Sequence, residues 1–451
     1  MKAPSKVTAL STISILLVIL FICSAALISC DEEGNTNESK PCEHVSVSDP
    51  AVSPTCQQTG LTEGAHCSLC GTVLAPQSSV PTVDHDYVDG LCSMCGAEKP
   101  VTLEDMFVFT ELEDGTYHIK ANDKSKLPKD LVIPSSYQGK TVTVIDGSAF
   151  KDCKAITSIT IPEGITVIGN SAFEGCTNLT KIFYNATKCS ALPMANKAFY
   201  NAGSSGDGIK VIIGANVKEM PESLFYSKNS QYSSSPTSPK IISVEFEEGS
   251  VCELIGNHSF FDCHYLVSVK IPDTVKEIDH AAFYNCKSLT ELDLGNGVKT
   301  IDNAAFYGCD SLKTLTIPAQ VELIVYSAFY YCTSLTELYF NATSCAIWDG
   351  GNVFADMGAD VAGVTVTIGA NVKSIPARLF QFDPYYSEAP KIVKLNFEEG
   401  SICGTIGWNA FKDCKSLAEI YYPGTEDAWK AIAIYEGNEI IQSATIHYQA
   451  N

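Results

Sequence analysis

The chain has 451 residues with 30 basic and 52 acidic side chains, which give it a formal net charge of −22. Arg378 is its only arginine. Phosphate binding favours clustered arginines and a basic surface, so the composition argues against nucleic acid and against a bare anionic lipid surface as partners.

The N-terminus has the features of an export signal. Two lysines precede a short apolar run over residues 13–22, and a Leu-Ile-Ser-Cys sequence ends at Cys30. This arrangement predicts a signal peptide over residues 1–29, because the run is short for a membrane-spanning helix. Leu-Ile-Ser-Cys resembles the lipobox of bacterial lipoproteins, which implies a lipidated Cys30 followed by a flexible tether over residues 30–40. The alternative is an ordinary cleaved signal with an incidental cysteine.

The acidic residues 31–33 follow directly. They resemble the surface-export signal of lipoproteins in some Gram-negative bacteria. The resemblance implies an extracytoplasmic, lipid-anchored protein on the outer surface of a bacterial cell, with the lipid as its only contact with the membrane.

Residues 41–100 form a cysteine-rich segment. It contains two Cys-x-x-Cys-Gly sequences with 21 residues between them. Two such turns supply the four thiolates of a closed tetrahedral zinc site, which predicts one structural zinc ion. The predicted ligands are Cys67, Cys70, Cys92 and Cys95. Cys42 and His44 could serve a second, incomplete site.

Disulfide bonds are the competing prediction for this segment, because exported proteins favour them, and free thiols are the remaining alternative. The segment has too little apolar sequence to fold on a hydrophobic core, so metal or cross-links must hold it together. The pattern resembles small zinc-ribbon-like modules of secreted bacterial surface proteins. In those modules a Pro-Thr-Cys sequence, here ending at Cys56, precedes one turn, and a His-x-Tyr sequence, here beginning at His85, lies between the two turns.

The rest of the chain is repetitive. Phe260, Phe283, Phe306 and Phe329 are each 23 residues apart. A fixed period of this size predicts a solenoid whose core forms only when the repeats stack. Within each repeat, alternation in Leu-x-x-Leu-x-Ile predicts a strand with one buried face, and the proline that follows ends it. A cysteine follows each repeated phenylalanine after two residues, and this column predicts reduced thiols packed in the core.

From about Leu131 onward, Ile-Pro and Ala-Phe-x-x-Cys recur together, and this combination resembles the BspA-like leucine-rich repeat family. The resemblance implies a right-handed, β-rich (α/β) solenoid with a cap at each end. We expect an N-terminal cap and partial repeat over 101–140, with a hairpin over 106–121. The repeat array would cover 141–418, and a capping repeat with a helix carrying Trp429 would cover 419–451.

A block of several turns is duplicated, and each copy carries an insertion, over residues 227–239 and 381–390. In each strand the residue between two buried positions must face outward. Three large apolar residues occupy such positions without an evident folding role, and exposed residues of this kind favour binding. The candidate ligand contacts are Phe183, Ile212 and Tyr339, together with Tyr385 and Tyr386 of the second insertion. The alternative is that they only cover neighbouring strands or pack under the inserted loops.

No sequence pattern predicts catalysis. The acidic pairs Glu247-Glu248 and Glu398-Glu399 resemble the carboxylates of glycoside hydrolases, but adjacent strand residues point to opposite faces. We therefore expect no enzyme. The resemblance implies an adhesin that binds an extracellular protein or glycan of a host or of other bacteria. The alternative is a structural or scaffolding lipoprotein of the cell envelope.

Overall fold

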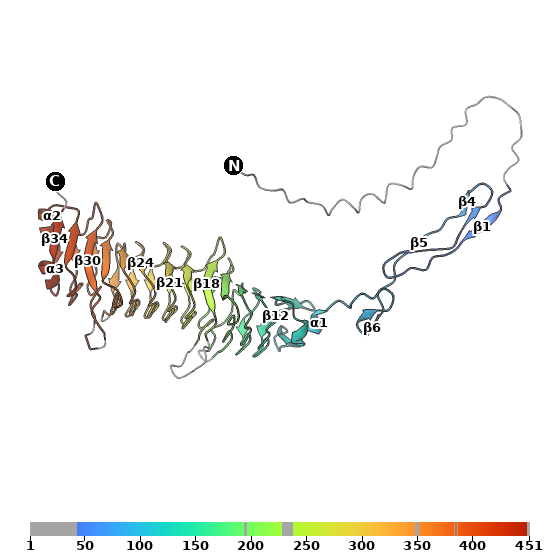
Figure 1. Ribbon diagram of the computed structural model, residues 1–451, viewed down its shortest axis with the longest axis horizontal. Helices are drawn as coiled ribbons and strands as arrows, with labels where there is room; N and C mark the ends of the chain where they lie inside the picture. Colours follow the sequence, from blue (N-terminus) through green and yellow to red (C-terminus); the bar gives the residue numbers. More distant parts are fainter. Residues whose placement is uncertain are drawn as a thin grey trace, which may run out of the picture. The chain divides into compact units, whose positions relative to one another are not determined.

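The computed structural model describes residues 43–193, 196–227, 238–347, 351–382, 384–385 and 387–448. The chain divides into two compact units, Met1–Pro100 and Val101–Asn451, and each is described by itself (Figure 1).

The first unit consists of short strands with loops between them. Three of them form an antiparallel sheet, namely β1 (Ser46–Asp49), β3 (Gly64–Cys67) and β4 (Val73–Ala75). Two further pairs are β2 (Gly60–Leu61) with β5 (Ser79–Val80), and β6 (Tyr87–Val88) with β7 (Leu91–Cys92). Among the described residues of this unit only Gly60, Gly64, Cys67 and Cys92 are buried. The described part of this unit, residues 43–100, therefore has no apolar core apart from two cysteine side chains.

The second unit begins with a cap. Helix α1 (Leu103–Met106) leads into an antiparallel hairpin of β8 (Phe107–Glu111) and β9 (Tyr117–Ala121), which confirms the predicted hairpin. After the 3-10 helix η1 (Lys124–Lys126) and β11 (Ser136–Tyr137), strand β12 (Lys140–Ile145) pairs in parallel with both β9 and β14 (Val167–Ile168). The hairpin thus joins the hydrogen-bonded ladder of the first turn.

The predicted β-solenoid is confirmed. Each turn contributes one strand to a parallel sheet, and the strands stack in chain order because each repeat buries its apolar face only against its neighbours. The first sheet contains β10 (Asp130–Val132), β13 (Ser158–Ile161), β15 (Lys181–Tyr184), β16 (Ile209–Ile213), β18 (Ile241–Phe246), β20 (Ser268–Lys270) and β22 (Glu291–Asp293). The second contains β24 (Thr314–Ile317), β26 (Glu337–Phe340), β28 (Val364–Ile368), β30 (Ile392–Phe397), β32 (Glu419–Tyr422) and β34 (Thr445–Tyr448).

A second column of two-residue strands runs along the solenoid. One sheet contains β17 (Glu219–Met220), β19 (Leu254–Ile255), β21 (Glu277–Ile278), β23 (Thr300–Ile301), β25 (Leu323–Ile324) and β27 (Ala346–Ile347), and another contains β29 (Ser374–Ile375), β31 (Thr405–Ile406) and β33 (Ala433–Ile434). The first main sheet ends at β22 and the second begins at β24, in the next turn. The short strands of these same two turns, β23 and β25, are paired. The two columns are interrupted at different levels, so adjacent turns stay joined by ladder hydrogen bonds there.

The core is a continuous column of phenylalanines with a column of thiols beside it. Neighbouring rings from Phe150 to Phe411 lie 5.0–5.5 Å apart, and Phe306 is almost parallel to both Phe283 and Phe329. Sγ of Cys309 donates to the carbonyl of Phe283 in the preceding turn at 3.5 Å. Burial raises the pKa of this cysteine well above its usual value, so the group is a neutral thiol. The predicted packed thiol column is therefore confirmed in the described solenoid, where it comprises Cys153, Cys176, Cys263, Cys286, Cys309, Cys332 and Cys414.

The C-terminal end is covered by α2 (Glu426–Lys430), α3 (Glu439–Ser443) and the last strand, β34. Trp429 of α2 is buried, with its ring 5.3 Å from Tyr422 and 5.8 Å from Phe397. These contacts keep water from the last apolar layer, which confirms the predicted capping role.

The two acidic pairs connect turns of the solenoid. Oε2 of Glu247 accepts a hydrogen bond from the backbone N–H of Ala215 at 3.1 Å, and Oε2 of Glu398 accepts one from Ala370 at 3.0 Å. The first glutamate of each pair thus satisfies a backbone donor of the preceding turn, and the duplicated motif has a structural explanation.

Candidate functional site

The apolar residues predicted on the main sheet occupy matching outward positions but are not freely exposed. Phe183 and Ile212 lie opposite each other on β15 and β16, and Tyr339 holds the corresponding position on β26. All three are partly buried, so the expected exposure was wrong. The reason is lateral cover, since Phe183 is flanked by Ile212 and by Lys181, whose Nζ lies 5.3 Å from the ring centroid. Ligand contact by these residues stays a prediction.

The other predicted positions are only partly within the described chain. Tyr385 is 84% exposed, while Tyr386 and Cys30 lie outside the described residues. Within the described part of the chain, no helix combines the length and apolar character needed to span a membrane. Lipidation at Cys30 stays a prediction.

The structure reveals an aromatic strip on the turns that follow the core phenylalanines. The strip is formed by the residue directly after each of five consecutive core phenylalanines: Tyr226, Phe261, Tyr284, Tyr307 and Tyr330. Neighbouring rings stack at centroid distances of 4.5–5.1 Å and interplanar angles of 4–28°. The two end residues, Tyr226 and Tyr330, are buried, and the three between them are partly buried. Because these three rings cover one another's faces, it is their edges that reach the surface, and Tyr284 and Tyr307 add hydroxyl groups there.

A hollow of about 410 Å³ lies beside the strip. It is lined by Tyr284, Tyr307, Tyr331, Lys287, Asp310 and Asp360, among others. Burial raises the pKa of Asp310, and the nearby Lys287 acts in the opposite direction. The hollow therefore combines rigid aromatic edges with carboxylates and one ammonium group.

Tyr331 is unusual for its position in the repeat. The second residue after the core phenylalanine has a left-handed backbone in nine described turns, and in the other eight it is aspartate, asparagine or glycine: Asp152, Gly175, Asn201, Asp262, Asn285, Gly308, Asp356 and Asp413. Those residues tolerate positive φ, whereas a bulky side chain is strained there. Tyr331 has φ 61° and is 40% exposed. Its ring contacts Tyr330 and Tyr307 of the strip, at centroid distances of 4.5 and 5.5 Å. A large residue that is strained and also exposed indicates a role other than folding.

Both ends of the strip adjoin the insertions. At one end, Tyr226 is followed by Ser227, the first residue of the first insertion, whose N–H donates to the carbonyl of Phe261 at 3.0 Å. At the other end, Tyr330 hydrogen-bonds to the carboxylate of Asp356. That carboxylate also accepts from the backbone N–H of Glu388, in the second insertion, at 3.1 Å. The described edges of the two insertions thus bracket the strip.

The sequence held a signal for this strip that the pattern analysis missed. The position after Ala-Phe or its equivalent is aromatic in six successive repeats, from Tyr200 to Tyr330, but the repeated motif Ala-Phe-x-x-Cys leaves it unspecified. Four of these residues, from Phe261 to Tyr330, keep the 23-residue period. A search for exposed columns outside the strands would have found it.

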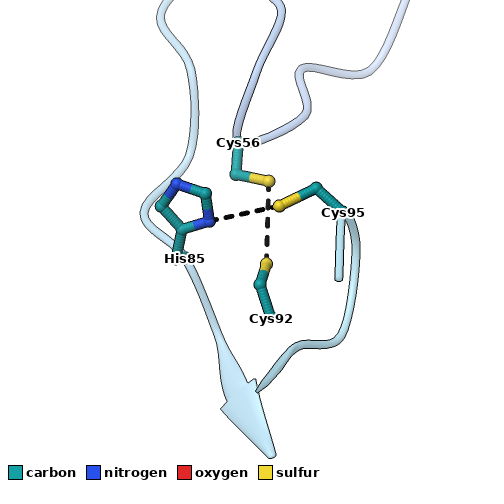
Figure 2. A group of neighbouring side chains, drawn as sticks. All are labelled: Cys56, His85, Cys92 and Cys95. Atoms are coloured by element: carbon teal, nitrogen blue, oxygen red, sulfur yellow. Dashed lines mark hydrogen bonds between the residues drawn. The ribbon is translucent and has the colours of Figure 1, made fainter. Parts of the chain in front are cut away.

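The cysteine-rich unit brings its ligating side chains into two separate groups. The first contains Cys56, His85, Cys92 and Cys95, whose ligand atoms all lie within 4.8 Å of one another. Figure 2 shows the four side chains converging from three segments of the chain. Sγ of Cys56 is 3.7 Å from Sγ of Cys92, and Nδ1 of His85 is 3.5 Å from Sγ of Cys95.

The second group contains His44, Cys67 and Cys70, again within 4.8 Å. Nδ1 of His44 is 3.4 Å from Sγ of Cys70. The structure therefore does not bring the four predicted ligands together, and the expected single grouping is corrected. Each Cys-x-x-Cys turn instead meets a histidine from an earlier segment, His44 before β1 for the first turn and His85 before β6 for the second.

Hydrogen bonds favour thiolate at the first cysteine of each turn. Burial raises the pKa of Cys67, but bonds from His44 and from the amides of Leu69 and Cys70 lower it to about 5 overall. At Cys92, burial also raises the pKa, but hydrogen bonds from His85 and from the backbone amides of Cys95 and Met94 lower it to about 6 overall. Cys56 differs, since burial and its two cysteine neighbours raise its pKa to about 11.

Comparison with known proteins gives a family match across the solenoid. The model of the BspA type leucine rich repeat region matches residues 143–250, 253–386 and 360–448, in six copies. No protein of curated function matches the chain.

Solved structures also resemble the chain. A leucine rich cell surface protein from Faecalibacterium prausnitzii is 19% identical, with 75% of this chain and 98% of that one covered, at a TM-score of 0.31. A leucine rich repeat protein from T. pallidum is 21% identical over 58% of this chain and 90% of that one, at 0.29. The pneumococcal vaccine antigen PcpA is 14% identical, with 78% of this chain and 98% of that one covered, at a TM-score of 0.30. The family model covers well over half of the chain, and the chain therefore belongs to the family of proteins with BspA type leucine-rich repeats.

Proposed function

We propose that the chain is a non-enzymatic adhesin that binds an extracellular protein on the aromatic strip and the adjoining hollow. The observation that carries this proposal is Tyr331, which occupies a strained left-handed position where the other turns use small or flexible residues. A strained, exposed side chain is retained when it contributes to function. Tyrosine is also among the residues that most often dominate the energetics of protein interfaces.

The surface favours a protein over a glycan. Sugar rings pack on exposed aromatic faces, whereas the stacked rings of the strip present their edges. The carboxylates of Asp310 and Asp360 suit lysine or arginine side chains of a partner. The net charge of −22 would also attract a basic surface from a distance. The expected ligand is therefore an extracellular protein with a basic contact surface.

The proposed location is the outside of a bacterial cell. Its support is the lipobox-like sequence at Cys30 and the name of one structural neighbour as a cell surface protein. Treatment of intact cells with added protease should remove the protein. Protection from the protease would favour the alternative, a scaffolding protein within the envelope.

Binding can be tested with immobilised extracellular matrix proteins and, in parallel, a glycan array. Wild-type protein should bind at least one basic matrix protein saturably, and the affinity should fall as salt is added. Tyr331→Asn should weaken this binding about tenfold or more. The matched control is Tyr435→Asn, which removes a tyrosine of similar exposure from the C-terminal cap and should leave binding unchanged. Binding to glycans alone, or equal losses in both variants, would overturn the proposal.

A further inference from the structure

We propose that the N-terminal unit holds two structural zinc ions in separate sites. The first site uses Cys56, His85, Cys92 and Cys95, and the second uses His44, Cys67 and Cys70. The inference is independent of ligand binding by the solenoid, because it concerns how a different unit of the chain folds.

The spacing of the ligand atoms matches a tetrahedral metal. Bonds of about 2.3 Å to sulfur and about 2.05 Å to nitrogen, at the tetrahedral angle, put neighbouring sulfurs about 3.8 Å apart and sulfur about 3.6 Å from nitrogen. In the first site the sulfurs of Cys56 and Cys92 are 3.7 Å apart, and Nδ1 of His85 is 3.5 Å from Cys95. In the second site, Nδ1 of His44 is 3.4 Å from Sγ of Cys70. These distances match the spacing of ligand atoms around a zinc ion, and in the first site the four side chains converge (Figure 2).

The two Cys-x-x-Cys turns have the same backbone geometry. In each turn the glycine N–H donates to the carbonyl of the first cysteine at 2.8 Å, from Gly71 to Cys67 and from Gly96 to Cys92. Both glycines have positive φ, 75° and 69°, which closes the turn and lets both cysteine side chains point to one side. Each turn therefore supplies a ready pair of thiolates, and each pair has its own histidine.

The donor set favours zinc. Thiolate and imidazole ligands in a tetrahedral arrangement are those that Zn²⁺ prefers. Three cysteines and one histidine complete the first site without an open position, so its role is structural. In the second site His44, Cys67 and Cys70 supply three ligands, one imidazole and two thiolates, which leaves one position of the tetrahedron for a further ligand.

The fold of the unit requires such a link. Its only buried side chains beyond glycine, among the described residues, are those of Cys67 and Cys92, one from each site. A unit of this size without an apolar core depends on metal or disulfides. Pairing in disulfides would leave the convergence of His44 and His85 on the sulfurs unexplained, whereas both are ordinary zinc ligands.

Zinc content of the full chain tests the proposal. Protein purified under reducing conditions and dialysed should retain about two zinc ions per chain by mass spectrometry of the metal. His85→Ala should retain about one, and so should Cys67→Ser, while the double variant should retain none. The matched controls are His66→Ala, whose imidazole pairs with Asp49 at 2.7 Å outside both groups, and Cys345→Ser in the solenoid. Both should keep two.

A cobalt titration gives a second measurement of the number of metal sites, which is needed if a variant fails to fold. Thiolate-to-cobalt absorption of the wild type should saturate at about two equivalents, and that of His85→Ala at about one. A single zinc ion that survives His85→Ala but is lost in both Cys67→Ser and Cys92→Ser would restore the one-site arrangement and overturn the proposal. Metal-free protein in which the cysteines are joined as disulfides would overturn it as well.

Discussion

Replacing Tyr331 with asparagine separates a binding role of this side chain from a folding role. Asparagine tolerates the left-handed backbone that tyrosine adopts at φ 61°, so the change should recover roughly 1 kcal/mol of strain. The change also removes two edge-to-face ring contacts, with Tyr330 at a centroid distance of 4.5 Å and with Tyr307 at 5.5 Å. Such pairs contribute about 0.5–1.5 kcal/mol when buried, and less for a ring that is 40% exposed. The two effects nearly cancel.

We therefore expect the free energy of unfolding of Tyr331→Asn to stay within about 1 kcal/mol of wild type. The reverse change two turns earlier, Asn285→Tyr, provides the control. It places tyrosine in the same left-handed conformation and removes the hydrogen bond from Nδ2 of Asn285 to Asp262, which is 3.0 Å long. It should cost about 2 kcal/mol, since strain and a lost hydrogen bond add.

The assay is guanidinium unfolding followed by circular dichroism, with hydrogen exchange to show whether the change stays local. Repeat proteins do not always unfold in two states, so the midpoints of the variants are compared with wild type under identical conditions. A loss of more than about 2 kcal/mol in Tyr331→Asn would mean that the ring is part of the folded core. The argument for binding at Tyr331 would then fail.

Four further outcomes are expected. Phe306→Ala should cost about 3–5 kcal/mol, because a cavity would open in the phenylalanine column, and hydrogen exchange should rise first in the adjoining turns; a loss below about 1 kcal/mol would contradict the core assignment. Chelation of metal should make residues 43–100 sensitive to protease while the solenoid stays intact, and equal resistance with and without chelator would contradict a structural metal. Cys30→Ala should move the protein from the detergent phase to the aqueous phase, and unchanged partitioning would argue against a lipid anchor. Phe183→Ser combined with Tyr339→Ser should weaken binding to a matrix protein about tenfold if the sheet face contributes, and unchanged affinity would place the contact elsewhere.

The repeat signal in the sequence was sufficient to predict the solenoid and its core. A 23-residue period with apolar residues at fixed places defines which side chains must be buried, because each turn repeats the same local geometry. Phe306 and Cys309 were therefore assigned to the core correctly from spacing alone. The caps were also predictable, since the 106–121 hairpin and the segment around Trp429 break the period where the stack ends.

The sequence did not determine how the cysteine-rich unit groups its ligands. The two Cys-x-x-Cys turns were identified correctly, but the choice of partner depends on the path of the loops around them, which have no periodic pattern. Only the folded chain brings His85 to Cys92 and His44 to Cys67.

The surface of the solenoid was likewise decided by the tertiary structure. Alternation along a strand showed that Phe183 faces outward, yet its burial depends on Lys181 and on the next strand, which only the three-dimensional packing defines. Tyr331 occupied a variable position of the consensus, and its strain became evident only from the backbone angle. A repeated sequence determines the scaffold, because its interactions recur in every turn. The contacts available to a ligand arise where single turns depart from the repeat, and these contacts depend on the neighbours that folding provides.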